Sequence, residues 1–155
     1  MSEDPRAFGP ITVDQFRPKS QARLATTEVS QARFRAIDAH NHFRENMDPA
    51  AAVAHMDACN VQTFVDLSGG HGDQLLRRLL MLKGGPYADR FAVFFVPDLR
   101  GIHQSDFGEV VARELEKAKQ AGVQGVKINK ELGLHLRDNH GRLVTVDDQR
   151  LSPMW

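Results

Sequence analysis

The sequence predicts an α/β fold with a parallel sheet, because strand-like and helix-like segments alternate four times along residues 34–155. The strongest strand signal is the continuous apolar run FAVFFV at residues 91–96, which is typical of a strand covered on both faces. A second signal is the placement of the histidines, several of which follow predicted strands. Together these observations predict a sheet with polar side chains at the carboxyl ends of its strands.

The composition is that of one globular domain preceded by an arm. Of the 155 residues, 41% are apolar and 26% are charged, and the formal net charge is zero. Residues 1–33 carry scattered apolar positions and several prolines, so we expect an extended arm there and the domain at residues 34–155. The absence of a basic excess argues against nucleic-acid binding, and no apolar run is long enough for a membrane span. Residues 1–15 lack a signal-peptide pattern, so a cytoplasmic protein is expected.

The first half of the domain is predicted to begin with a strand at residues 36–42. Asp48 and Pro49 then make a typical helix start, with Asp48 as the N-cap and Pro49 at the first helical position. This helix is expected to end near Cys59, the single cysteine, which we expect to be a small core residue. A second strand follows at residues 61–67 and leads into a glycine-rich turn.

Two further helices are predicted on either side of the strand at residues 91–96. Asp73 is expected to cap the first helix, which ends at Gly84, and Asp106 is expected to cap the second, which stops at Gly122. Apolar residues recur at helical spacing in both, namely Leu75, Leu76, Leu79 and Leu80 in the first helix and Val111, Leu115 and Ala118 in the second.

The last part of the sequence predicts a fourth strand and a small hairpin. The strand is expected at residues 125–130, and the hairpin at residues 137–146 around the turn sequence DNHG. Residues 147–155 are expected to enter another helix.

The segment DAHNH at residues 38–42 carries the main chemical signal. Side chains two apart on a strand share a face, so His40 and His42 could converge on one metal ion, with Asp38 on the same face to orient a ring. Such a pair also occurs by chance, as two partly exposed polar residues at a strand end. Asp66, near the end of the second strand, is interpreted as a carboxylate that caps a loop.

Two architectures compete for this pattern. A doubly wound sheet of the flavodoxin-like kind normally has a glycine-rich phosphate turn after its first strand, whereas here that strand ends in the two histidines. A TIM (β/α)8 barrel places its chemistry at the carboxyl ends of its strands, which suits His71 and His103 after the second and third strands. Both could equally be solvent-exposed loop histidines. We therefore predict a partial TIM barrel: four β/α units, a small hairpin and an extended N-terminal arm.

The predicted domain is too short for a complete TIM barrel, because such a barrel takes about 250 residues and the domain is about half as long. A half barrel would leave its first and fourth strands as open edges. We therefore expect a truncated, inactive amino-terminal half. An alternative is a non-catalytic homodimer in which two copies supply eight strands.

Three stretches also point to a family, and they occur in the order IDAHNHF, GVQGVKINKELGL and GRLVTVDDQRLSPMW. Together they resemble the amidohydrolase-related (amidohydrolase 2) family of the metal-dependent hydrolase superfamily, over roughly residues 34–155. The resemblance implies a (β/α)8 barrel that holds a divalent metal, most often zinc, with His40 and His42 as ligands. It also implies further ligands on strands five, six and eight, which do not occur in this sequence.

The fourth strand adds a candidate catalytic residue. Val126 and Ile128 are the apolar alternates and should face the helices, so Lys127 and Asn129 should face the barrel axis. Some members of the superfamily carbamylate an inward lysine here to bridge metals, but a free amine that binds a substrate carboxylate is equally plausible. A lysine that is merely hydrogen-bonded inside the barrel would look the same.

The resemblance implies an enzyme that hydrolyses a small molecule with a metal-activated water. In that mechanism His40 and His42 would bind zinc, Lys127 would neutralise charge, and His71, His103 and Asn129 would contact the substrate. A decarboxylase-type lyase on the same scaffold is the alternative that the sequence leaves open.

Overall fold

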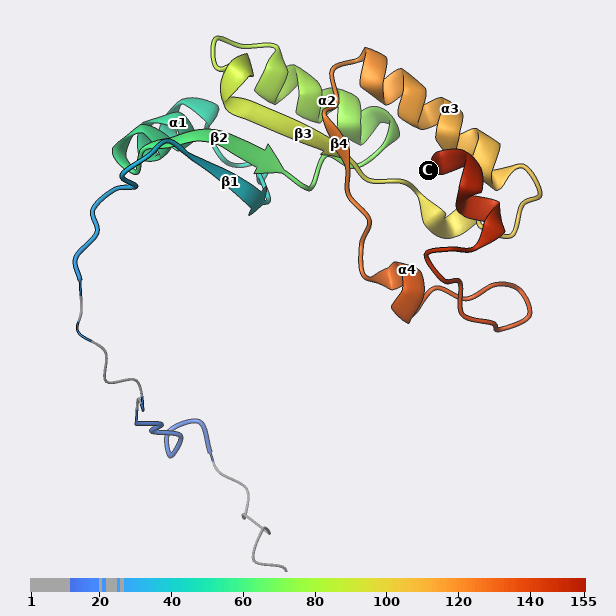
Figure 1. Ribbon diagram of the computed structural model, residues 1–155, viewed down its shortest axis with the longest axis horizontal. Helices are drawn as coiled ribbons and strands as arrows, with labels where there is room; N and C mark the ends of the chain where they lie inside the picture. The colour runs from blue at the N-terminus through green and yellow to red at the C-terminus, as the bar shows by residue number, and fades with distance from the viewer. Residues whose placement is uncertain (1–11, 20, 22–24, 26) are drawn as a thin grey trace, which may run out of the picture.

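Four parallel strands form one curled sheet, in the order in which they occur in the chain (Figure 1). The structure is a computed structural model, and it describes residues 12–19, 21, 25 and 27–155. The strands are β1 (Ala36–Asn41), β2 (Val61–Asp66), β3 (Phe91–Phe95) and β4 (Gly125–Val126). Each strand pairs in parallel with the next, which confirms the predicted α/β fold with a parallel sheet.

Three helices pack against one face of this sheet, namely α1 (Pro49–Ala58), α2 (Gly72–Lys83) and α3 (Phe107–Gln120) (Figure 1). Their buried side chains join those of Phe64, Phe91, Val93 and Phe95 in one core cluster. The alternate strand residues face away from the helices and form a second, smaller apolar cluster, made of Val65, Leu67, Ala92 and Phe94. The two faces of the sheet therefore differ. One is buried under the three helices, whereas the other, which we call the uncovered face because none of these helices lies over it, carries only the small apolar cluster.

Strand β4 lies close to β3 because position 125 is a glycine. Phe94 pairs with Gly125, and a Cβ at that position would collide with the Phe94 ring. The strand ends sooner than predicted, since the regular pairing covers only Gly125–Val126. The backbone N–H of Lys127 still donates to the carbonyl of Phe95 at 2.7 Å, so the chain keeps the direction of β4 for one more residue.

The helix boundaries test the predicted caps. Asp48 caps α1 as expected, because its Oδ1 accepts from the N–H of Ala50 at 3.0 Å. The prediction that Asp73 caps α2 is wrong: this helix begins at Gly72, and His71 occupies the N-cap. The chain turns into the helix earlier because Gly70 and Gly72 both adopt positive φ.

Helix α3 begins after Asp106, which sits at the N-cap without a capping hydrogen bond from its side chain. It is followed by Gly122 at φ +104°, the predicted stop. The expectation of a buried Cys59 is wrong, because this residue follows the end of α1 and is exposed.

The segment after β4 forms a loop structure that projects beyond the sheet (Figure 1). A short, kinked helix that the sequence did not predict, α4 (Glu131–Leu134), contains Gly133 at φ +84°. The predicted hairpin is confirmed by an antiparallel bridge between Arg137 and Leu143. Residues 147–155 were expected to enter a helix, and they form the 3-10 helix η3 (Gln149–Met154) against α3.

Two further 3-10 turns lie beside β3, namely η1 (Ala88–Arg90) before it and η2 (Leu99–Gly101) after it.

Of the predicted arm, residues 1–11, 20, 22–24 and 26 lie outside the described residues. The described remainder up to residue 33 forms no helix or strand, and the Ala32 N–H donates to the Cys59 carbonyl at 3.0 Å. Within the described part of the chain, no helix has both the length and the apolarity to cross a membrane.

Candidate functional site

The two histidines of β1 lie side by side at the carboxyl end of the strand. Asn41 pairs with Asp66 of β2, so its neighbours His40 and His42 lie on the opposite face of the sheet, away from the helices. Their ring centroids are 5.7 Å apart with an angle of 64° between the ring planes, and both residues are exposed. The strand thus presents two imidazoles together on the uncovered face.

Asp38 does not share that face. The pairing of β1 with β2 is irregular between Asp38 and Asn41, and Asp38 pairs with Phe64, which belongs to the core beneath the helices. The carboxylate of Asp38 accepts a hydrogen bond from the Asn41 amide at 2.5 Å. The predicted role of Asp38 in orienting a histidine ring is therefore replaced by a role in shaping the strand end, because the bulge shifts the alternation by one residue.

A buried ion pair holds the chain directly after His42. Asp66 is fully buried, and its Oδ1 accepts from the backbone N–H groups of Phe43 and Ser68, each at 3.0 Å. Arg78 of α2 lies with its Nε 3.4 Å from Asp66 Oδ2 and donates from Nη1 to the carbonyl of Phe43. Both backbone polar groups of Phe43 are thereby fixed, which confirms Asp66 as a loop-capping carboxylate.

The histidine pair lacks a third partner in the part of the chain that the structure describes. No group of three His, Cys, Asp or Glu side chains among these residues is arranged to hold a metal ion. A catalytic zinc site generally has three protein ligands and one open position. Among the described residues, His40 and His42 therefore form a pair of potential ligands, one fewer than such a site uses.

A cavity of about 260 Å³ opens at the carboxyl ends of β3 and β4. It brings together three of the predicted site residues, His71, Lys127 and Asn129. Val126 and Ile128 pack against the core cluster under the helices, as the strand alternation predicted. The remaining walls come from the loop after β3 and from the segment after β4, namely Val96, Pro97, Asp98, Leu99, Arg100, Glu131 and Leu136.

His71 is held against the end of β3. Its Nδ1 lies 3.2 Å from the carbonyl oxygen of Val96, and its Nε2 lies 3.6 Å from Asp98 Oδ2. Asp98 in turn accepts hydrogen bonds from the guanidinium of Arg100 on both oxygens, the shortest at 2.6 Å. The hydrogen bond from Arg100 lowers the pKa of Asp98 to about 2, so this carboxylate is charged at neutral pH.

His103 does not join the other predicted substrate-binding residues. The loop after β3 turns through η2, and His103 lines a separate cavity of about 440 Å³ against the start of α3. Sequence reasoning missed Asp98 and Arg100, which line both cavities. The signal that could have found them is an acid and a base two residues apart, directly after the apolar third strand.

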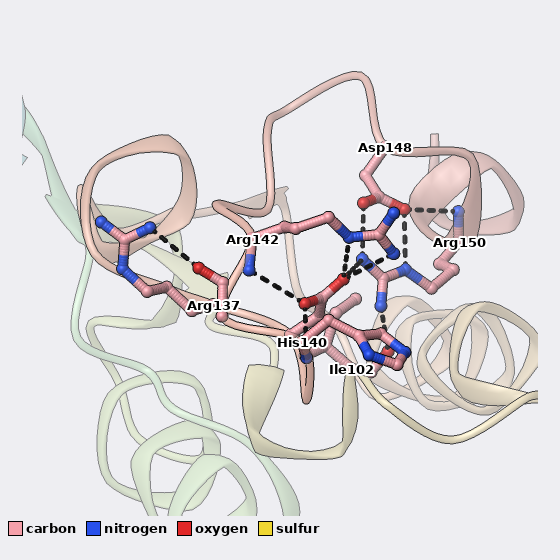
Figure 2. Close-up of polar contacts among 8 residues, drawn as sticks. Ile102, Arg137, His140, Arg142, Asp148 and Arg150 are labelled. Carbon is pink, nitrogen blue, oxygen red and sulfur yellow. Dashed lines mark hydrogen bonds and ion pairs between the residues drawn. The ribbon is translucent and has the colours of Figure 1, made fainter.

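A network of charged side chains fastens the hairpin to η3, because Arg150 Nη2 lies 3.9 Å from Asp138 Oδ2 (Figure 2). Arg142 contacts Asp138 through Nη2 at 2.9 Å, and Arg150 contacts Asp148 through Nη2 at 2.7 Å. Arg150 also donates from Nη1 to the carbonyl of Ile102 at 3.3 Å, which ties η3 to the loop after β3. The side-chain hydrogen bond from Arg150 lowers the pKa of Asp148 to about 2. At Asp138, burial acts to raise the pKa, but the hydrogen bonds from Arg142 act in the opposite direction and the pKa is lowered.

A backbone hydrogen bond of the hairpin also holds a residue of the cavity wall. Leu136, which lines the cavity, accepts from the N–H of Val144 at 2.9 Å across the hairpin. The hairpin and the loop after β3 are linked through Arg150, which contacts both Asp138 and the carbonyl of Ile102.

Comparison with protein-family models, with curated proteins and with solved structures found no match for this chain.

Proposed function

We propose that this chain is half of a (β/α)8 barrel of the amidohydrolase type, and that it binds a divalent metal, zinc, through His40 and His42. The observation that carries the proposal is the pair of exposed imidazoles on the uncovered face of β1, with ring centroids 5.7 Å apart. Neutral imidazole is a common ligand of zinc, and two rings at this separation can share one ion.

The sheet topology supports the barrel half of the proposal. The strand order is sequential, and α1, α2 and α3 pack on one face, as in one half of a (β/α)8 barrel. A doubly wound sheet has helices on both faces and reverses its strand order. Strands β1 and β4 are the two edges of the described sheet, so we place the missing ligands on further strands that would pair with these edges.

The chemistry of the proposed site divides between the metal and the chain. A bound divalent metal would supply an activated water and would polarise a substrate carbonyl. Lys127 would neutralise negative charge on the substrate, while His71 and Asn129 would position it, because all three line one cavity. His103 is left without a role in this proposal, since it lines the neighbouring cavity.

Metal binding tests the proposal directly. Because the described residues offer two ligands and no third, we expect the chain to bind one Co²⁺ or Zn²⁺ weakly and to turn over no amide or lactone substrate. His40→Asn and His42→Asn should each abolish Co²⁺ binding, measured by visible absorbance. His55→Asn is the matched control, because His55 is exposed on α1, and it should change nothing.

Two results would contradict the proposal. One is stoichiometric, chelator-resistant metal in a monomer after gel filtration, which would require a complete ligand set. The other is unchanged Co²⁺ binding in the two strand variants. In a protein with the remaining strands present, amide, lactone and unsaturated carboxylic acid panels would separate hydrolysis from decarboxylation by the release of CO₂.

A further inference from the structure

The cavity beside Lys127 has the features of a binding site for a small carboxylate, and we propose that it binds an organic acid with an apolar body. This inference names a substrate class for the proposed function, and its catalytic meaning rests on that function. Binding of the acid does not require a metal, so the two can be tested separately.

Lys127 is directed toward the cavity by the backbone of β4. Its N–H donates to the carbonyl of Phe95 at 2.7 Å, and the residues on either side, Val126 and Ile128, pack into the core under the helices. Strand alternation therefore sends the Lys127 side chain to the opposite face, where it lines the cavity with Asn129. The side chain is half-buried, so its charge is less screened than that of a surface lysine.

The Lys127 amine has no acidic partner in the part of the chain that the structure describes, where no carboxylate lies within 4.0 Å of it. The two carboxylates that line the cavity are Asp98 and Glu131. Asp98 stays ionised, but its charge is balanced by the guanidinium of Arg100, and Glu131 is exposed. The ammonium group is therefore the free charge of this site, and it favours an anion.

The other walls restrict which anion fits. Asn129 can donate a hydrogen bond to a carboxylate oxygen, and His71 lies at the opposite loop. The apolar walls, Val96, Pro97, Leu99 and Leu136, would contact an aliphatic or aromatic body. A volume of about 260 Å³ limits the ligand to a small molecule. These walls favour an amphipathic carboxylate over inorganic phosphate, which has no apolar part.

Benzoate and benzamide are suitable probes because they have nearly the same shape and differ in charge. We expect benzoate, titrated into the ¹⁵N-labelled chain at low salt, to shift the amide signals of Lys127, Asn129 and His71. Lys127→Gln should weaken benzoate binding at least tenfold, whereas Lys127→Arg, which keeps the positive charge, should retain most of the affinity for benzoate. Lys130→Gln removes an exposed lysine three residues along and is the matched control.

Several outcomes would overturn the inference: equal affinity for benzoate and benzamide, unchanged benzoate binding in Lys127→Gln, or shifts that map elsewhere. If Lys127→Gln does not fold, the salt dependence of benzoate binding to the unchanged chain tests the same contact. Benzoate binding that does not weaken between low and high salt excludes a contact with the ammonium group. The double variant His40→Asn/His42→Asn should lose Co²⁺ and keep benzoate. A failure of either site alone is thus distinguishable from a failure of the other.

Discussion

Removal of the Asp66 carboxylate should be among the most destabilising single changes in this domain. Asp66 is fully buried, so Asp66→Ala leaves the guanidinium of Arg78 without its charged partner at a position that is only 6% exposed. It also removes the acceptor for the backbone N–H groups of Phe43 and Ser68. Breaking a buried ion pair in this way costs about 3–5 kcal/mol, against a total stability of roughly 5–15 kcal/mol for a domain.

Urea denaturation followed by far-UV circular dichroism measures this cost. With a slope of about 1–3 kcal/mol per molar urea, the midpoint should fall by roughly 2 M at an unchanged slope. The control is Asp57→Asn, which breaks the ion pair with Arg90. That pair is shorter, at 2.7 Å against 3.4 Å, but Asp57 is 63% exposed, so we expect a loss of less than about 1 kcal/mol.

Comparing Asp66→Ala with Asp57→Asn separates the effect of burial on stability from the effect of the distance between the paired charges. If Asp66→Ala costs no more than Asp57→Asn, the Asp66 carboxylate does not hold the end of β1, and the clamp on Phe43 is not a source of stability. A double variant, Asp66→Leu/Arg78→Leu, should recover part of the loss, because it removes the unpaired charge along with its partner.

Two further predictions concern packing and pH. Leu82→Ala should cost about 2–5 kcal/mol in the same urea assay, because Leu82 is 1% exposed, whereas Leu80→Ala on the same helix should cost less than about 0.5 kcal/mol, because Leu80 is 76% exposed; equal losses would contradict this core. The pKa of Asp148 is lowered to about 2 by Arg150, so its stabilising contribution is present above pH 4 and is lost as the pH falls toward 2. Asp148→Asn should therefore lose on the order of 1 kcal/mol at pH 7 and flatten the decline in thermal stability between pH 4 and pH 2, and an unchanged pH profile would refute the pairing.

Much of the fold followed from local patterns. The apolar run at residues 91–96 became β3, the Asp48-Pro49 start became the capped beginning of α1, and Gly122 ended α3 at a positive φ. These features depend on neighbours in sequence, since a cap or a glycine stop acts within one turn. The cap of α2 was missed because two glycines in unusual backbone conformations let the helix begin before Asp73.

The site required tertiary information. That His71, Lys127 and Asn129 line one cavity while His103 lines another depends on how the loop after β3 turns through η2. The face occupied by Asp38 depends on an irregular pairing between two strands. Neither the turn nor the irregularity has a local sequence signal strong enough to predict it.

By itself, the sequence determined the order of the four strands of the sheet and of helices α1, α2 and α3, and it placed the two histidines at the end of β1. Periodicity and capping are set by residues within a few positions of each other, so they can be deduced without coordinates. The tertiary structure alone decided which side chains meet: the buried pair of Asp66 and Arg78, and the open cavity beside Lys127. Such contacts join segments far apart in the chain, and their geometry is set by the packing of the whole sheet and its helices.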